Sequence, residues 1–169
     1  MKRTFNKLLI AGTGTRGGSD DAIGLRLVEL LAPEFQRQNI ETRYWEGADA
    51  LTLTQELLEL DSQVLIVDCA DMGIPSGQSR HFSLGDIRSK APRAGISTHG
   101  FGILEALELA KALGFEQPVS FFGIQPFDLS AGMEMTAEMK ALEFGLCTEL
   151  RQCVAELKGL TDTLCAKTA

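Results

Sequence analysis

The sequence is poor in histidine and cysteine, and it has no long apolar run. Its two histidines exclude a metal site built from three histidines. The four cysteines form no CxxC pair and no zinc-ribbon spacing, so we expect reduced thiols rather than a disulfide framework. No segment approaches the ~18 apolar residues of a membrane span, and the apolar run before Gly12 is too short for a secretory signal. We therefore expect a cytoplasmic protein.

Positive charge is also scarce. The formal net charge is −7, and the lysines and arginines form no cluster. Binding to nucleic acid or to an anionic membrane surface requires a basic face, so we expect neither partner. The acidic balance suits contact with a neutral or basic protein segment. The patterns HExxH and GxSxG are missing too, which argues against a zincin and against a serine hydrolase of the nucleophile-elbow type.

Short apolar runs alternate with longer amphipathic stretches along the chain. Gln63–Asp68 contains four consecutive apolar residues, which indicates a strand buried on both faces, as in a parallel sheet. Ser19 is expected to cap the first helix and Pro33 to kink or end it. We predict a single domain over residues 1–169 with an α/β fold and a mainly parallel sheet. The expected strands are 7–12, 40–45, 63–68, 79–84 and 119–124, and the expected helices are about 20–33, 51–60, 99–113 and 137–158, with a frayed tail from about 159.

Three polar residues stand where an α/β fold places its ligand site. Asp21 follows the turn after the first strand, Asp68 ends the strongest strand, and His99 opens a helix. Ligands of open α/β sheets bind beyond the carboxyl ends of the strands. If the first and third strands are neighbours, both acids lie on the same rim. Two carboxylates and one imidazole suit zinc or nickel better than magnesium or copper(I).

Each of these residues also has a purely structural interpretation. Asp21 can stabilise the positive end of its helix, a contribution worth ~0.3–1 kcal/mol. Asp68 can cap the loop that follows its strand, and His99 can cap or pack its helix. The other histidine, His81, lies in a weak strand and is expected at the surface.

The glycine-rich turn GTGTRGG at residues 12–18 invites comparison with phosphate-binding loops. It matches neither GxxxxGK[ST] nor GxGxxG. The two acids that follow the turn would repel a phosphate, so a nucleotide site is disfavoured here.

Taken together, four segments between about Leu8 and Leu157 resemble the hydrogenase maturation endopeptidases. Each motif is weak alone, and their order and spacing make the resemblance specific. The segments are Gly12-Thr13-Gly14 through Asp20-Asp21-Ala22-Ile23-Gly24, similar to GxGN…DDGxG; Val67-Asp68-Cys69-Ala70-Asp71 with Gly73, Pro75 and Gly77, similar to VDAVD..G.PG; Ser97 to Ile103, similar to S.H..G; and Gly123-Ile124-Gln125-Pro126, similar to GIQP.

The resemblance implies a three-layer α/β/α sandwich of the phosphorylase/hydrolase-like kind. It implies a metal-dependent endopeptidase that removes a C-terminal peptide from the precursor of a nickel-iron hydrogenase large subunit after nickel insertion. Asp21, Asp68 and His99 would be the metal ligands and the catalytic set. The nickel would be carried by the substrate, and zinc or cadmium could occupy the site in crystals.

The sequence departs from the family pattern at two turns. Thr15 stands where the family usually has Asn, and Trp45-Glu46-Gly47-Ala48 replaces a DGG[TS] turn that helps to select the partner subunit. The resemblance therefore implies that Glu46, Gly47 and Ala48 contact the substrate. The first ligand is Asp, where some members have Glu.

Two other functions use the same features. A non-catalytic nickel-dependent chaperone of the large subunit would use the same three residues without releasing a peptide. A flavodoxin-like fold could also bind a small molecule or nucleotide at the same rim.

Overall fold

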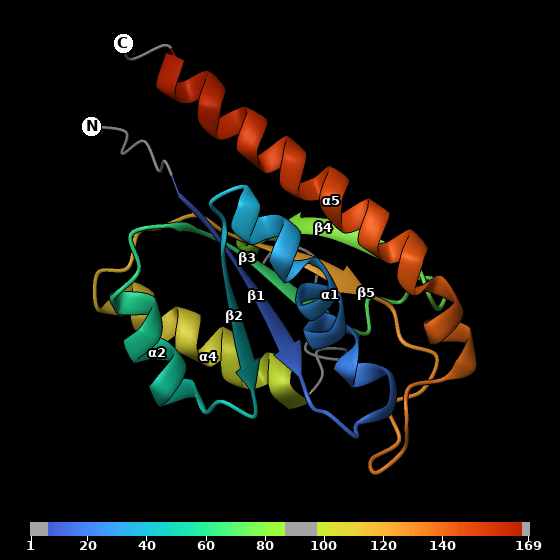
Figure 1. Ribbon diagram of the computed structural model, residues 1–169. Coiled ribbons are helices and arrows are strands. Elements are labelled where there is room, and N and C mark those ends of the chain that lie inside the picture. Colours follow the sequence, from blue (N-terminus) through green and yellow to red (C-terminus); the bar gives the residue numbers. More distant parts are fainter. Residues whose placement is uncertain (1–6, 87–97, 167–169) are drawn as a thin grey trace.

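The five strands form one sheet with the order β2-β1-β3-β5-β4. The structure is a computed structural model that describes residues 7–86 and 98–166 (Figure 1). All neighbouring strands run parallel except the edge strand β4, which is antiparallel to β5. The predicted α/β fold with a mainly parallel sheet is confirmed. The strands are β1 (Leu8–Gly14), β2 (Glu41–Glu46), β3 (Gln63–Cys69), β4 (Ser79–Ser83) and β5 (Val119–Ile124).

Helices cover both faces of the sheet and make it the middle of three layers (Figure 1). One face packs against α1 and α5, and the other packs against α2 and α4. Among the described residues, none of the helices combines the length and apolar character that a membrane crossing needs. The helices are the 3-10 turn η1 (Ser19–Ala22), α1 (Ile23–Arg37), α2 (Ala50–Leu58), α4 (Thr98–Ala112) and α5 (Ala137–Ala166).

The first and third strands are neighbours, as the rim hypothesis requires. β1 pairs with β3 in parallel, with Gly12 opposite Val67. Every residue of β1 and β5 is buried, as is β3 after its first residue. Apolar runs without alternation produce this pattern because each central strand has helices above and below it.

Three predictions about where helices begin and end are wrong. Pro33 does not end α1, which continues to Arg37 because the buried Phe35 holds the last turn against the core. Ser19 does not cap the helix: η1 precedes α1, and neither element has a side-chain cap hydrogen bond. The C-terminal helix α5 extends to Ala166 instead of ending at Lys158, since no proline interrupts the segment.

The start of α1 packs directly on the sheet because residue 24 is glycine. A Cβ atom at Gly24 would lie 2.3 Å from the carbonyl oxygen of Val67 and 2.7 Å from that of Thr13. Gly14, at the end of β1, makes a similar close contact with η1. Its φ is +129°, and a Cβ atom there would lie 2.0 Å from the carbonyl oxygen of Asp21. These two glycines let η1 and α1 approach β1 and β3 more closely than any side chain allows.

We expect Gly24→Ala to destabilise the fold by about 2–3 kcal/mol or more, because its methyl group must displace the backbone of two strands. Gly145→Ala is the matched control. Gly145 is exposed on α5 with nothing near its missing Cβ, so alanine there should stabilise by up to ~1 kcal/mol. Urea unfolding of both variants measures the difference. Equal stabilities would contradict the close contact.

Candidate active site

Asp68 is a buried carboxylic acid at the carboxyl end of β3. Only 5% of the residue is exposed. The Oγ1 of Thr13, on the neighbouring strand β1, donates a hydrogen bond of 2.6 Å to its Oδ1. Burial and, to a smaller extent, the negative charge of Asp21 together raise the pKa of Asp68 to about 7, against the opposing effect of the Thr13 hydrogen bond. Near neutral pH this carboxyl group therefore exchanges a proton readily.

Asp21 lies in η1, directly after the loop that follows β1. It is also buried, with 6% of the residue exposed. Its charge acts on both Asp68 and Cys69, so the structure brings the two predicted acids together at one edge of the sheet. Two buried carboxylates that repel each other favour the binding of a proton or a cation between them.

His99 belongs to the first turn of α4, and its side chain lies outside the described residues. α4 leads into β5, which runs parallel to β3. The helix therefore begins on the side of the sheet where β3 ends. Among the residues whose side chains are described, which do not include His99, no group of three metal-binding side chains gathers. The assignment of His99 as a ligand stays a prediction, whereas His81 is exposed on β4 as expected.

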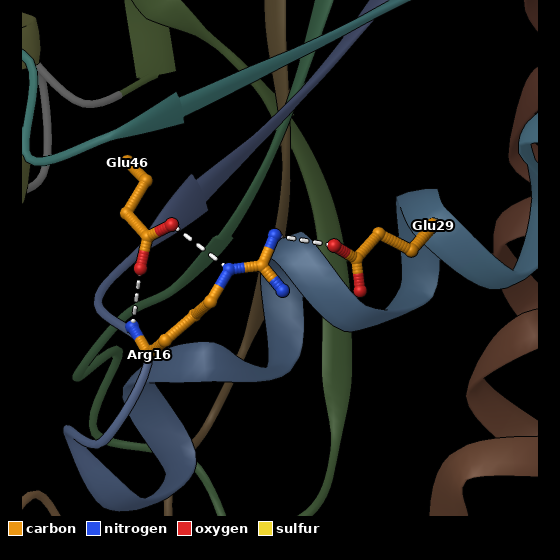
Figure 2. A network of polar contacts seen from close by, with 3 residues as sticks. All are labelled: Arg16, Glu29 and Glu46. Carbon is orange, nitrogen blue, oxygen red and sulfur yellow. Dashed lines mark hydrogen bonds and ion pairs between the residues drawn. The ribbon is translucent and has the colours of Figure 1, made fainter.

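The residues predicted to contact substrate lie at the same edge. Glu46 ends β2 and is paired with Gly14 in the sheet register. Arg16 binds this carboxylate twice, from its backbone nitrogen at 2.9 Å and from Nε at 2.8 Å, and its guanidinium also pairs with Glu29 of α1 (Figure 2). These bonds lower the pKa of Glu46 and tie its turn to the loop before Asp21. Gly47 is exposed with φ +60°, and Ala48 packs against the α2/α4 core.

Asp20 is a candidate functional residue to which the sequence pattern alone assigned no role. Its carboxylate is completely buried and accepts hydrogen bonds from four donor groups in the loop of residues 125–136. The donors are the backbone nitrogens of Phe127 (2.8 Å) and Asp128 (3.1 Å) to Oδ2, and the backbone nitrogen and Oγ1 of Thr136 (both 2.9 Å) to Oδ1. Hydrogen bonds to a charged group are worth roughly 1.5–3 kcal/mol each. The tandem acids therefore differ in their surroundings: the loop engages Asp20, whereas the charge of Asp21 acts on Asp68.

Gln125 is a second residue whose role the sequence did not reveal. Its Oε1 accepts a hydrogen bond of 2.7 Å from the backbone nitrogen of Met72, and its Nε2 donates one of 3.0 Å to Asp71. The side chain thereby fixes the loop that follows Asp68. The GIQP motif marked this position, but a motif alone does not reveal what the amide contacts.

The thiol beside Asp68 does not suit the role of a nucleophile. Cys69 is fully buried, and burial together with the charges of Asp68 and Asp21 raises its pKa. A thiol with a raised pKa carries little of the reactive thiolate near neutral pH. Cys147 and Cys153 are buried free thiols too, as predicted.

Comparison with known proteins gives a consistent set of relatives. The chain is 26% identical over 129 residues to the hydrogenase expression/formation protein HupD of Thiocapsa roseopersicina, a match that covers 75% of this chain and 58% of that protein's length. The [NiFe] hydrogenase maturation protease HybD of Thermococcus kodakarensis has a similar structure, with a TM-score of 0.69, 22% identity, and 87% of this chain and 98% of that chain covered. The hydrogenase maturating endopeptidase HybD of E. coli gives a TM-score of 0.70 at 19% identity, with 89% and 93% covered.

These structural likenesses show a shared fold. The family evidence is the match of residues 25–143 to the model described as hydrogenase maturation protease. The matched span includes Asp68 and His99 and begins just after Asp21. Because it covers more than half of the sequence, the chain belongs to the hydrogenase maturation protease family.

Proposed function

We propose that this chain is an endopeptidase that removes a C-terminal peptide from the large-subunit precursor of a nickel-iron hydrogenase after nickel insertion. Family membership supports the reaction and the partner. The observation that carries the proposal is the pair of buried carboxylates, Asp21 and Asp68, at the edge of the sheet where α/β folds bind their ligands. We place this reaction in the cytoplasm, in a single domain.

The donor set fits a divalent ion carried by the substrate. Asp68 is buried beside another carboxylate, and a cation would offset both the burial and the repulsion that raise its pKa. Asp21, Asp68 and His99 would bind the nickel that the precursor already holds. Oxygen and imidazole donors suit nickel, and free zinc or cadmium could replace it in crystals.

In this mechanism the residues of the chain mainly recognise and orient the substrate. The substrate's nickel polarises the scissile carbonyl or a water molecule. Asp68 releases its proton on binding the ion, and Thr13 keeps one carboxylate oxygen in a fixed direction. A precursor without nickel offers these ligands nothing to bind, so binding through the metal makes cleavage depend on loading.

The turn of Glu46, Gly47 and Ala48 would contact the large subunit beside the metal. Its position at the end of β2, next to the loop that carries Asp21, supports this role. Arg16 holds Glu46 in place through an ion pair and also pairs with Glu29, so the turn would meet the partner in a defined position.

We expect His99→Ala and Asp68→Asn to slow peptide release at least ~100-fold, because each removes a ligand of the substrate's nickel. The assay incubates each variant with nickel-loaded precursor and follows the mass of the large subunit by mass spectrometry. His81→Ala is the matched control and should cleave normally, since His81 is exposed on β4. Cleavage by His99→Ala at the wild-type rate would refute its role, and binding of the precursor without any loss of mass would indicate a chaperone.

We expect Glu46→Gln to raise KM for the precursor several-fold while Ni²⁺ affinity stays unchanged, because it weakens the bonds from Arg16 that fix the turn. Glu41→Gln, at the opposite end of β2, provides the control. Steady-state cleavage and titration calorimetry separate the two effects. A loss of Ni²⁺ affinity in Glu46→Gln would place Glu46 among the ligands instead.

We expect Asp68→Asn to stabilise the protein at alkaline pH. Between pH 4 and 7 the unfolded chain loses the Asp68 proton while the folded chain keeps it, so rising pH lowers wild-type stability. Above pH 7 the full penalty is at most about 4 kcal/mol. Asparagine carries no charge and keeps an oxygen that can accept the Thr13 bond. Urea unfolding in chelator should show a gain of roughly 2–4 kcal/mol at pH 8 and little difference at pH 4. Equal stabilities at pH 8 would contradict the raised pKa.

A further inference from the structure

The tandem acids of η1 differ in what surrounds them. Asp21 is buried at the edge of the sheet where the neighbouring strands β1 and β3 end, whereas Asp20 points its carboxylate into the loop of residues 125–136, which we call the rim loop. Both oxygens of Asp20 are engaged, and all four donor groups belong to the rim loop. The carboxylate has no solvent exposure, so these bonds must replace the water that burial removed.

The backbone repeats the same connection. The Asp20 nitrogen donates to the Asp128 carbonyl oxygen at 3.2 Å, the Ser19 nitrogen to Met133 at 2.9 Å, and the Gly132 nitrogen to the carbonyl oxygen of Gly17 at 2.8 Å. Residues 17–20 are thus joined to the rim loop along their length, and the rim loop has no helix or strand of its own.

Backbone strain lies at the same place. Ser19 has φ +55°, a left-handed conformation that is unfavourable for residues other than glycine. Such strain persists only where the surroundings hold the residue firmly, and it clusters at functional sites. We call the hydrogen bonds between Asp20 and the rim loop the Asp20 clamp. Ser19 lies two residues before Asp21, so the Asp20 clamp and the strain at Ser19 both act on the short turn that carries Asp21.

We propose that Asp20 is a positioning residue for metal capture: its buried carboxylate fastens the rim loop to the turn of Asp21 and so holds Asp21 in the orientation that binds the ion. This inference rests on the proposed function, because it takes Asp21 as a ligand. The rim loop itself, through Met133 and Met135, also lines an open hollow of about 600 Å³ together with Gly17. Fixing the loop therefore also shapes this hollow.

Asp20→Asn tests the proposal with almost no change in size. The asparagine amide would point a donor at backbone nitrogens that are themselves donors, which breaks part of the clamp. We expect Ni²⁺ affinity of the whole chain, measured by titration calorimetry well below the unfolding temperature, to fall at least ~10-fold. Asp61→Asn is the matched control and should leave Ni²⁺ affinity unchanged, because Asp61 is exposed, pairs with Lys7 and precedes β3, at the opposite end of that strand from Asp68.

Thr136 variants keep the test decisive if Asp20→Asn does not fold. Thr136→Val removes the hydroxyl bond to Asp20 and should weaken Ni²⁺ binding by a smaller factor, about 3-fold, while Thr136→Ser restores the hydroxyl and the affinity. Thr148→Val removes a comparable exposed hydroxyl bond on α5, away from Asp20, and should have no effect.

The outcomes distinguish this inference from the function on which it rests. One outcome overturns the role of Asp20 and leaves the proposed site standing. In it, wild type binds Ni²⁺ and Asp68→Asn binds it more weakly, but Asp20→Asn and Thr136→Val both keep the wild-type affinity. Wild-type protein that does not bind Ni²⁺, or Asp68→Asn that binds as well as wild type, overturns the site and this inference together. A moderate loss of Ni²⁺ affinity in Thr136→Val, a larger loss in Asp20→Asn and wild-type affinity in Thr136→Ser would support both the site and the role of Asp20.

Discussion

The close packing of α1 on the centre of the sheet determines the geometry of the whole site. Gly24 brings the helix backbone against the carbonyl oxygens of Val67 and Thr13, at the ends of the two central strands. Asp21 precedes this contact by three residues and Asp68 follows Val67 directly, so the same contact that completes the core also sets the spacing of the two acids. A larger residue at position 24 would separate the layers and the carboxylates at once. Stability and site geometry therefore share one cause in this part of the fold.

The site nevertheless opposes stability. Burying Asp68 beside Asp21 raises its pKa to about 7, and no lysine or arginine in the described ion pairs faces it. A core made for stability alone would place an apolar or amide side chain there. The chain keeps an acid whose proton is held weakly at neutral pH, which is useful only if something with positive charge replaces that proton. The contrast with Asp20 is informative, because an equally buried acid can be fully satisfied by neutral donors.

The sequence predicted features that depend on neighbouring residues, and it failed where distant segments decide. The unbroken apolar runs of β1 and β3 predicted buried parallel strands, and their adjacency placed Asp21 and Asp68 on one rim. Pro33 was expected to kink or end its helix; it does not end it, because packing of Phe35 outweighs the loss of one backbone donor. The Asp20 clamp joins residues more than one hundred positions apart, so no local pattern could reveal it. For the same reason, the tandem acids could not be assigned separate roles before their contacts were known.

The two hydrogen bonds from Arg16 to Glu46 join two loops at the edge of the sheet. The turn at residues 46–48 and the loop before Asp21 come from different strands, and Arg16 joins them through both its main chain and its side chain (Figure 2). A turn grafted from another protease without an acid at position 46 would leave the Arg16 amide and guanidinium without these acceptors. Under the proposed role of this turn, a chimera designed to change partner preference therefore has to carry residues 16 and 46 together.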